Sequence, residues 1–210
     1  MKIAVFGSTG PTGQLIVKYA LSKGYQVVAY ARNPSKIGFQ HPDLTVIRGT
    51  LYDSAAIEKT VSGVDAVISM LGASSNVKTT ELSKGMSNII IAMQKHNVKR
   101  LVAMGTASVN DDNDQSELKF RLLVSIVKRL IPGAYNEIRR IGGLVKQSGL
   151  QWTLIRIGLL SNRPPNGNVV VGYYGNHKLK LRISRSDLAR FFVDQIISDQ
   201  HLYKAPAVSN

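Results

Sequence analysis

The 210-residue chain contains no cysteine, which excludes disulfides and thiolate metal or redox sites. Its four histidines, at positions 41, 96, 177 and 201, show no metal-ligand spacing with one another or with carboxylates, so we expect no metal centre. A Gly-x-Ser-x-Gly motif is also missing, which argues against a Ser-His-Asp hydrolase. No apolar run approaches the ~20 residues of a membrane span, and no signal-peptide pattern opens the chain. We therefore expect a cytoplasmic protein without a membrane partner.

Acidic residues are scarce: 13 Asp and Glu stand against 27 Lys and Arg, for a net charge of +14. Such an excess raises nucleic acid as a partner. The basic residues are scattered, however, and the chain has no zinc-finger, basic-zipper or RNA-recognition signature. We therefore expect a basic surface that favours anionic cofactors and substrates, with nucleic acid an unlikely partner.

The first thirteen residues carry the clearest functional pattern. An apolar run at residues 3–6 predicts a buried strand over residues 2–6, and a helical pattern spans residues 12–22. Between them lie Gly7, Gly10 and Gly13, at the spacing of a phosphate-cradling turn. Gly7 allows a sharp turn, Gly10 admits a pyrophosphate close to the backbone, and Gly13 lets the helix approach the strand. The pattern predicts a dinucleotide site; the alternative is a glycine-rich turn that binds nothing.

Predicted strands and helices alternate along the rest of the chain, which is typical of βαβ units. We expect a single α/β domain over residues 1–210, a doubly wound parallel sheet with helices on both faces. The expected strands are 2–6, 25–30, 44–48, 65–70, 100–104 and 151–157, with an edge hairpin of 169–174 and 178–183. The expected helices are 12–22, 53–61, 81–96, 118–130, 135–147 and 184–198.

The end of the second strand indicates which nicotinamide cofactor binds. In a doubly wound fold this point lies beside the adenosine ribose, where an acidic residue would select NAD. The chain has Arg32 there, with Ser35 and Lys36 close behind. A guanidinium pairs bidentately with a 2′-phosphate, and a lysine adds a point charge. The sequence therefore favours NADP, the alternative being a solvated arginine in a loop.

The carboxyl ends of the later strands predict the acceptor side of the site. Thr106 follows the fifth strand, where its hydroxyl can reach a substrate carbonyl over the nicotinamide. Segments 106–135 and 158–182 are expected to surround the substrate, and the polar stretch 110–116 is expected to be mobile or a lid. The amphipathic, basic segment 118–130 is interpreted as a surface helix, a membrane-touching helix or a pocket wall, of which we prefer the pocket wall.

Four stretches together resemble a known family. They are Gly7-Ser-Thr-Gly10-Pro-Thr-Gly13, Ala31-Arg32-Asn-Pro34, Ser148-Gly-Leu-Gln-Trp152-Thr-Leu-Ile-Arg156 and Ile183-Ser-Arg-Ser-Asp187-Leu-Ala189. The chain is similar over its whole length to the atypical short-chain dehydrogenase/reductases. Within them it is most similar to the NAD(P)H-binding NmrA-like proteins and the biliverdin-IX-beta and flavin reductases. The resemblance implies one Rossmann domain, bound NADP, and a flavin or quinone as acceptor.

The same resemblance assigns roles by position. It implies that Gly7, Thr9, Gly10, Pro11 and Thr12 contact the phosphates and that Arg32, Ser35 and Lys36 hold the 2′-phosphate. It places Thr50 and Leu51 beside the adenine, Leu71 and Gly72 beside the ribose, and Thr106 near the nicotinamide. The chain departs from the wider family in having Tyr135-Asn-Glu-Ile-Arg139 in place of a Tyr-x-x-x-Lys pair. It departs from the flavin reductases in having Thr50 for an aspartate, Leu159 for a histidine and Ile157 for a proline.

These observations lead to one expected function and one alternative. The expected function is an NADPH-dependent reductase that transfers hydride to a flavin or quinone and acts as a monomer or homodimer. Hydride transfer to such acceptors needs little acid–base machinery, which suits a chain without an evident catalytic triad. Thr106 would orient the nicotinamide carboxamide or the acceptor carbonyl, and Tyr135 is a candidate proton donor, unless it is merely a surface-packed tyrosine. The alternative function is an NADP-binding redox sensor without turnover.

Overall fold

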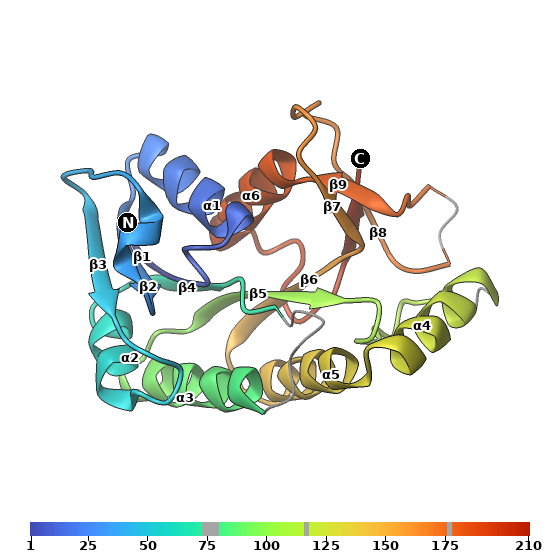
Figure 1. Cartoon of the computed structure of the whole chain (residues 1–210), viewed down its shortest axis with the longest axis horizontal. Coiled ribbons are helices and arrows are strands. Elements are labelled where there is room, and N and C mark those ends of the chain that lie inside the picture. Colours follow the sequence, from blue (N-terminus) through green and yellow to red (C-terminus); the bar gives the residue numbers. More distant parts are fainter. Residues whose placement is uncertain (73–79, 116–117, 176–177) are drawn as a thin grey trace.

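The computed structural model describes residues 1–72, 80–115, 118–175 and 178–210. These residues form a single α/β domain of three layers, a central sheet between two layers of helices (Figure 1). Helices α1 and α6 cover one face, α2, α3 and α5 cover the other, and α4 extends beyond the sheet at one end. The helices are α1 (Pro11–Ser22), α2 (Ser54–Val61), α3 (Glu81–Lys95), α4 (Leu118–Leu130), α5 (Pro132–Lys146) and α6 (Arg185–Asp194). Short 3-10 turns lie at Pro34–Ile37 and Gln195–Ile197.

The main sheet has eight strands in the order β3-β2-β1-β4-β5-β6-β10-β8. All neighbours pair in parallel except β8, which is antiparallel to β10. The order reverses between β1 and β4, the position at which doubly wound sheets bind ligands. The strands are β1 (Lys2–Phe6), β2 (Gln26–Ala31), β3 (Leu44–Arg48), β4 (Ala66–Ser69), β5 (Arg100–Thr106), β6 (Gln151–Ile157), β8 (Val170–Gly172) and β10 (Ala207–Ser209).

The predicted sheet and helices are confirmed, but the predicted edge hairpin is wrong. Strand β8 pairs with β10 instead of with residues 178–183. Strand β9 (Arg182–Ser184) pairs in parallel with β7 (Leu159–Ser161) in a separate two-stranded sheet. The Gly-Asn pair at 175–176 suggested a tight turn, but the partners of both strands lie far away in sequence, and residues 176–177 lie outside the described residues.

The core explains the uninterrupted apolar run that follows Lys2 in β1. As a central strand, β1 is covered by helices on both faces, so Ile3, Ala4, Val5 and Phe6 are all fully buried. The last helix begins as predicted, because the Ser184 hydroxyl accepts a hydrogen bond from the Asp187 backbone N–H at 3.0 Å. In the described part of the chain, no helix is long and apolar enough to cross a bilayer.

Residues 110–115 are anchored to β6, contrary to the expectation of a mobile segment or lid. The guanidinium of Arg156 is fully buried and donates to both carboxylate oxygens of Asp114, at 2.5 and 2.7 Å. A further donation, at 3.0 Å, reaches the carbonyl of Val109. Asp111 accepts from the backbone N–H of Ala205 at 2.6 Å. The sequence of this acidic stretch resembles that of a solvated loop. Its cationic partner, Arg156, lies more than 40 residues away, so the local pattern gives no sign of the ion pair.

Candidate nucleotide and acceptor site

The turn between β1 and α1 requires glycine at two of its three glycine positions. Gly7 has a φ of +78°, and a Cβ there would lie 2.8 Å from the carbonyl oxygen of Met70. A Cβ at Gly13 would collide with the carbonyl oxygen of Gly7. Gly10 has ordinary backbone angles, and a Cβ there would stand 3.5 Å from the nearest protein atom. The protein itself therefore leaves room for a side chain at Gly10, which suits the predicted approach of a ligand to the backbone.

The N-terminus of α1 is open to an anion. Gly10 is its N-cap residue and supplies no side-chain hydrogen bond, and Pro11 occupies the first helical turn. The N–H groups of that turn and the positive end of the helix dipole form a site for phosphate. Ser8 is buried and donates to the carbonyl of Tyr30 at 2.8 Å, which ties the turn to β2. These residues fit a dinucleotide diphosphate.

Gln14 joins this turn to the segment after β2, a role that the sequence did not reveal. Its Nε2 donates to the carbonyl of Thr9 at 3.2 Å and to that of Lys36 at 2.9 Å. The backbone at Lys36 therefore lies beside the phosphate turn. Arg32, Ser35 and Lys36 are exposed, as ligands for a 2′-phosphate must be. A glutamine at the fourth position of the first helix is not a recognisable signal, because its second partner lies 22 residues away.

The adenine and ribose predictions fall on residues with different surroundings. Thr50 is exposed, and its carbonyl accepts from the Tyr30 hydroxyl at 2.7 Å. Burial raises the pKa of Tyr30 to about 12, so this donor keeps its proton. The Leu51 side chain lies mostly in the core, against α3. Leu71 is buried and Gly72 is exposed at the end of β4, while the residues that follow, 73–79, lie outside the described residues.

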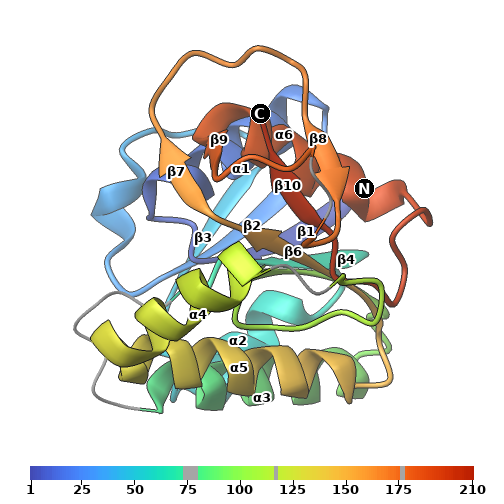
Figure 2. The same ribbon diagram turned by 90° about the vertical axis from the view of Figure 1, so that its right-hand side faces the viewer.

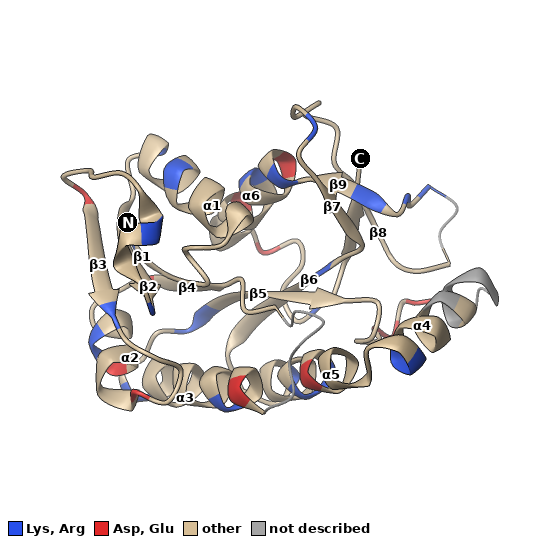
Figure 3. Cartoon of the chain, viewed as in Figure 1, with Lys and Arg blue, Asp and Glu red and all other residues tan. Residues whose placement is uncertain are grey.

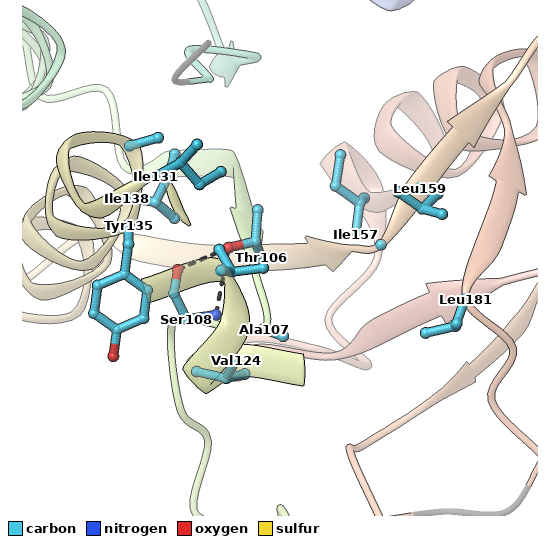
Figure 4. A pocket seen from close by; sticks show the side chains of 13 residues that line it. Thr106, Ala107, Ser108, Val124, Ile131, Tyr135, Ile138, Ile157, Leu159 and Leu181 are labelled. Carbon is cyan, nitrogen blue, oxygen red and sulfur yellow. Dashed lines mark hydrogen bonds between the residues drawn. The ribbon is translucent and has the colours of Figure 1, made fainter. Parts of the chain in front are cut away.

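A cavity of about 250 Å³ opens beyond the carboxyl ends of β5 and β6 (Figure 4). It draws on both segments that were expected to surround the substrate, 106–135 and 158–182. Most of the lining is aliphatic, with three hydroxyl side chains among it. The lining residues are Thr106, Ala107, Ser108, Val124, Val127, Ile131, Ala134, Tyr135, Ile138, Ile157, Gly158, Leu159 and Leu181. An apolar site with few polar groups is typical of a small-molecule pocket.

Two of the hydroxyls form a pair. The Oγ1 of Thr106 and the Oγ of Ser108 are 2.7 Å apart, and the Ser108 backbone N–H donates to Thr106 Oγ1 at 3.3 Å. Since one hydroxyl donates to the other, the proton of the accepting hydroxyl is available to a ligand. Ser108 is buried in the pocket wall and was missed at the sequence level. The Thr-x-Ser spacing at the end of a strand is the signal that would have found it.

Tyr135 lies in the same pocket as this pair (Figure 4). It is half-buried in the first turn of α5, and the Arg139 guanidinium stands 5.7 Å from the centre of its ring. Arg139 therefore makes a cation–π contact with the face of the Tyr135 ring. A proton-donor role for Tyr135 stays a prediction. Within the described residues, no group of three or more His, Asp or Glu side chains is arranged to hold a metal ion.

The fold and the glycine turn together define a Rossmann-type nucleotide-binding protein. A family model described as NAD(P)H-binding matches residues 7–199. The chain belongs to this NAD(P)H-binding family, as the resemblance implied.

Relatives of the chain include reductases and uncharacterised proteins. It is 25% identical to protein YwnB of Bacillus subtilis, over 96% of this chain and 94% of that protein. It is 28% identical to the chloroplastic protein At2g34460 of Arabidopsis thaliana, over 97% of this chain and 74% of that protein. A shorter match, 34% identical over 52% of this chain and 34% of the relative, is to 2-alkyl-3-oxoalkanoate reductase of Stenotrophomonas maltophilia.

Solved structures share the fold over the entire chain. The anaerobilin reductase ChuY of Escherichia coli O157:H7 superposes with a TM-score of 0.80 at 15% identity, covering 100% of this chain and 97% of that one. A short-chain dehydrogenase/reductase of Veillonella parvula, solved in complex with NADP, gives 0.78 at 18% identity, covering 100% and 94%.

Proposed function

We propose that this chain is an NADPH-dependent reductase whose acceptor is a flavin or quinone. The observation that carries the proposal is the apolar cavity with its paired hydroxyls at the ends of β5 and β6. In a doubly wound fold this place adjoins the nicotinamide of a cofactor bound at the first turn. Bound NADPH would supply the hydride, and a proton from water completes the reduction of a quinone to a hydroquinone. The transfer would convert NADPH into NADP⁺.

The chain's own residues bind, orient and exclude water. Buried aliphatic side chains such as Ile138 and Ile157 hold a planar ring and keep water from it. The Thr106–Ser108 pair donates a hydrogen bond to an acceptor carbonyl, where negative charge develops during the transfer. Leu159 stands in the pocket wall where the flavin reductases have a histidine, so the wall is purely aliphatic at that point.

The 2′-phosphate of NADP is assigned to Arg32, Ser35 and Lys36. Gln14 supports this assignment, because it holds the Lys36 backbone beside the phosphate turn. Arg32→Glu should lower the affinity for NADP relative to NAD by about 10- to 100-fold, the loss of a charge-assisted pair. Lys99→Glu makes the same charge change at the amino end of β5 and should leave the ratio unchanged. An unchanged ratio in Arg32→Glu would refute the assignment.

The reaction is tested by following NADPH oxidation at 340 nm with FMN, riboflavin and a panel of quinones. Ser108→Ala and Thr106→Val should each lower kcat/KM about tenfold or more, because each removes a hydrogen bond to the charge that develops on the acceptor. Nucleotide affinity, measured by calorimetry, should stay unchanged in Ser108→Ala. If no acceptor accelerates NADPH oxidation while NADP still binds tightly, the reductase proposal fails and the redox-sensor alternative is favoured.

A further inference from the structure

Helix α4 carries more apolar surface than the protein covers. Val124 and Val127 face the cavity, while Leu122, Ile126 and Leu130 repeat every four residues on another side. The side chains of these three are 62%, 46% and 73% exposed. A soluble helix usually exposes polar residues opposite its buried face. Helix α4 lies beside α5 on the side toward β6 and β7 (Figure 2), and its Val124 and Val127 make it one wall of the pocket.

The opposite rim of the cavity has the same character. Leu159 and Leu181 line the cavity, and their exposed fractions are 56% and 50%. Lys180 and Arg182, on either side of Leu181, are exposed. On α4 the corresponding cations are Lys128 and Arg129 in the last turn. Figure 3 shows basic residues on α4 and on β9 at the same end of the molecule.

We propose that this end of the molecule docks onto an anionic lipid bilayer, with the outer stripe of α4 and the leucine rim facing the acyl chains. Charge identifies the occupant. The sequence of α4 contains four basic residues and no acidic one, and residues 178–182 contain three basic residues and no acidic one. A second copy docked through the same surface would bring like charges together, whereas anionic headgroups complement them.

This geometry agrees with a monotopic attachment. A basic helix with an exposed apolar face lies in the headgroup region and inserts that face about 5–10 Å. The expectation of no membrane partner came from the lack of a spanning segment, which does not bear on such an attachment.

The acceptor class follows from the shared wall. The same helix contributes Val124 and Val127 to the cavity and Leu122 and Ile126 to the exposed stripe. A docked molecule would therefore hold its cavity against the bilayer, and the acceptor would be a lipophilic quinone dissolved in the membrane. This second part rests on the proposed reductase function, but the attachment itself does not.

The test is cosedimentation of the full chain with vesicles of phosphatidylcholine alone or mixed with phosphatidylglycerol. We expect binding only to the anionic vesicles. Lys128→Glu/Arg129→Glu should weaken it by about 25-fold, since each cation near an anionic surface contributes about fivefold. Lys59→Glu/Lys99→Glu changes the net charge equally on exposed residues elsewhere and should have a much smaller effect.

The apolar contribution has its own variants. Leu122→Ser/Ile126→Ser/Leu130→Ser should abolish vesicle binding, whereas Ile91→Ser and Ile197→Ser, also exposed, should not. Equal binding of the wild type to neutral and anionic vesicles, or no binding to either, would overturn the proposal. So would a dimer in sedimentation velocity that the triple variant dissociates while vesicle binding persists.

A water-soluble quinone separates this proposal from the proposed function. The α4 variants should reduce it at the wild-type rate, but should lose activity toward a long-chain quinone embedded in anionic vesicles. If the wild type reduces no quinone yet binds the vesicles as expected, the reductase function fails and the attachment stands. If it reduces soluble quinone but ignores anionic vesicles, the attachment fails and the reductase function stands.

Discussion

Replacing Asp114 by asparagine should destabilise the protein strongly. The Asp114 carboxylate accepts four hydrogen bonds: two from Arg156, one from the Asp111 backbone N–H at 2.8 Å and one from the Tyr174 backbone N–H at 3.0 Å. Its side chain is 19% exposed and that of Arg156 is 0% exposed. An amide has one accepting oxygen in place of two and no charge. The substitution therefore removes the carboxylate that is hydrogen-bonded to a buried guanidinium.

The magnitude follows from the burial of Arg156. Breaking one side of a buried ion pair costs about 3–5 kcal/mol, because the remaining charge cannot be resolvated. The Arg156 Nε has no hydrogen-bond partner among the described residues, so the guanidinium has no spare interaction to compensate. The Arg156 guanidinium also stands 4.5 Å from the ring centre of Tyr174, a contact that stays in place but does not neutralise the charge. For a chain of this size the loss corresponds to a Tm lower by roughly 6–20 °C.

Thermal and urea unfolding at pH 7 measure this loss. Asp112→Asn removes the same charge from an exposed residue of the same segment and is expected to change Tm by less than about 2 °C. Because Arg156 also holds the Val109 carbonyl, just after Ser108, Asp114→Asn should raise KM for the acceptor too. If both variants unfold at the same temperature, the buried ion pair does not anchor this segment as argued here.

Three further predictions concern the nucleotide site and acid stability. Gly13→Ala should weaken NADP binding by about tenfold or more in calorimetry, because its Cβ collides with the Gly7 carbonyl and distorts the turn; undiminished affinity would contradict this geometry. Gln14→Leu should lower the affinity for NADP more than that for NAD, since it releases the Lys36 backbone; equal losses would place Lys36 away from the 2′-phosphate. Burial alone would raise the pKa of Asp187, but hydroxyl and N–H donors to its carboxylate lower it overall. Its contribution to the free energy of unfolding is therefore complete above about pH 4 and lost as the pH falls through the lowered value. Urea titrations between pH 2.5 and 7 should show a shallower acid loss in Asp187→Asn than in the wild type.

The nucleotide half of the fold was predictable because its determinants are adjacent in sequence. A strand, a glycine turn and a helix occupy the first 22 residues, and each supports the assignment of the next. The requirement for glycine at position 13 also arises within these residues, because a Cβ there would collide with the carbonyl oxygen of Gly7. The requirement at Gly7 involves one distant residue, Met70. Local patterns suffice when the interacting residues follow one another along the chain.

The acceptor half was less predictable because distant segments complete it. Strand β8 pairs with a three-residue strand more than 30 residues later, too short to give a periodic signal. The position of Asp114 depends on its ion pair with Arg156, and nothing in the sequence around either residue indicates that the two pair. The spacing of Thr106 and Ser108 is visible in the sequence, but the cavity that the two hydroxyls line is formed by β5, α4, α5 and the β6–β7 region together.

The two halves of the site also recognise their ligands by different means. The phosphate turn uses backbone N–H groups and the lack of side chains, so it needs few particular residues besides glycine. The fold can thus persist in proteins only 15–24% identical to this chain. The acceptor cavity instead uses side chains, and this chain fills it with aliphatic residues and a hydroxyl pair. Such a wall can fit the shape of a ligand, exclude water and donate one hydrogen bond, and it has no charged lining residue. Under the proposed function, this wall would favour an uncharged planar acceptor over an anionic one, and the cations of the rim would serve the proposed attachment.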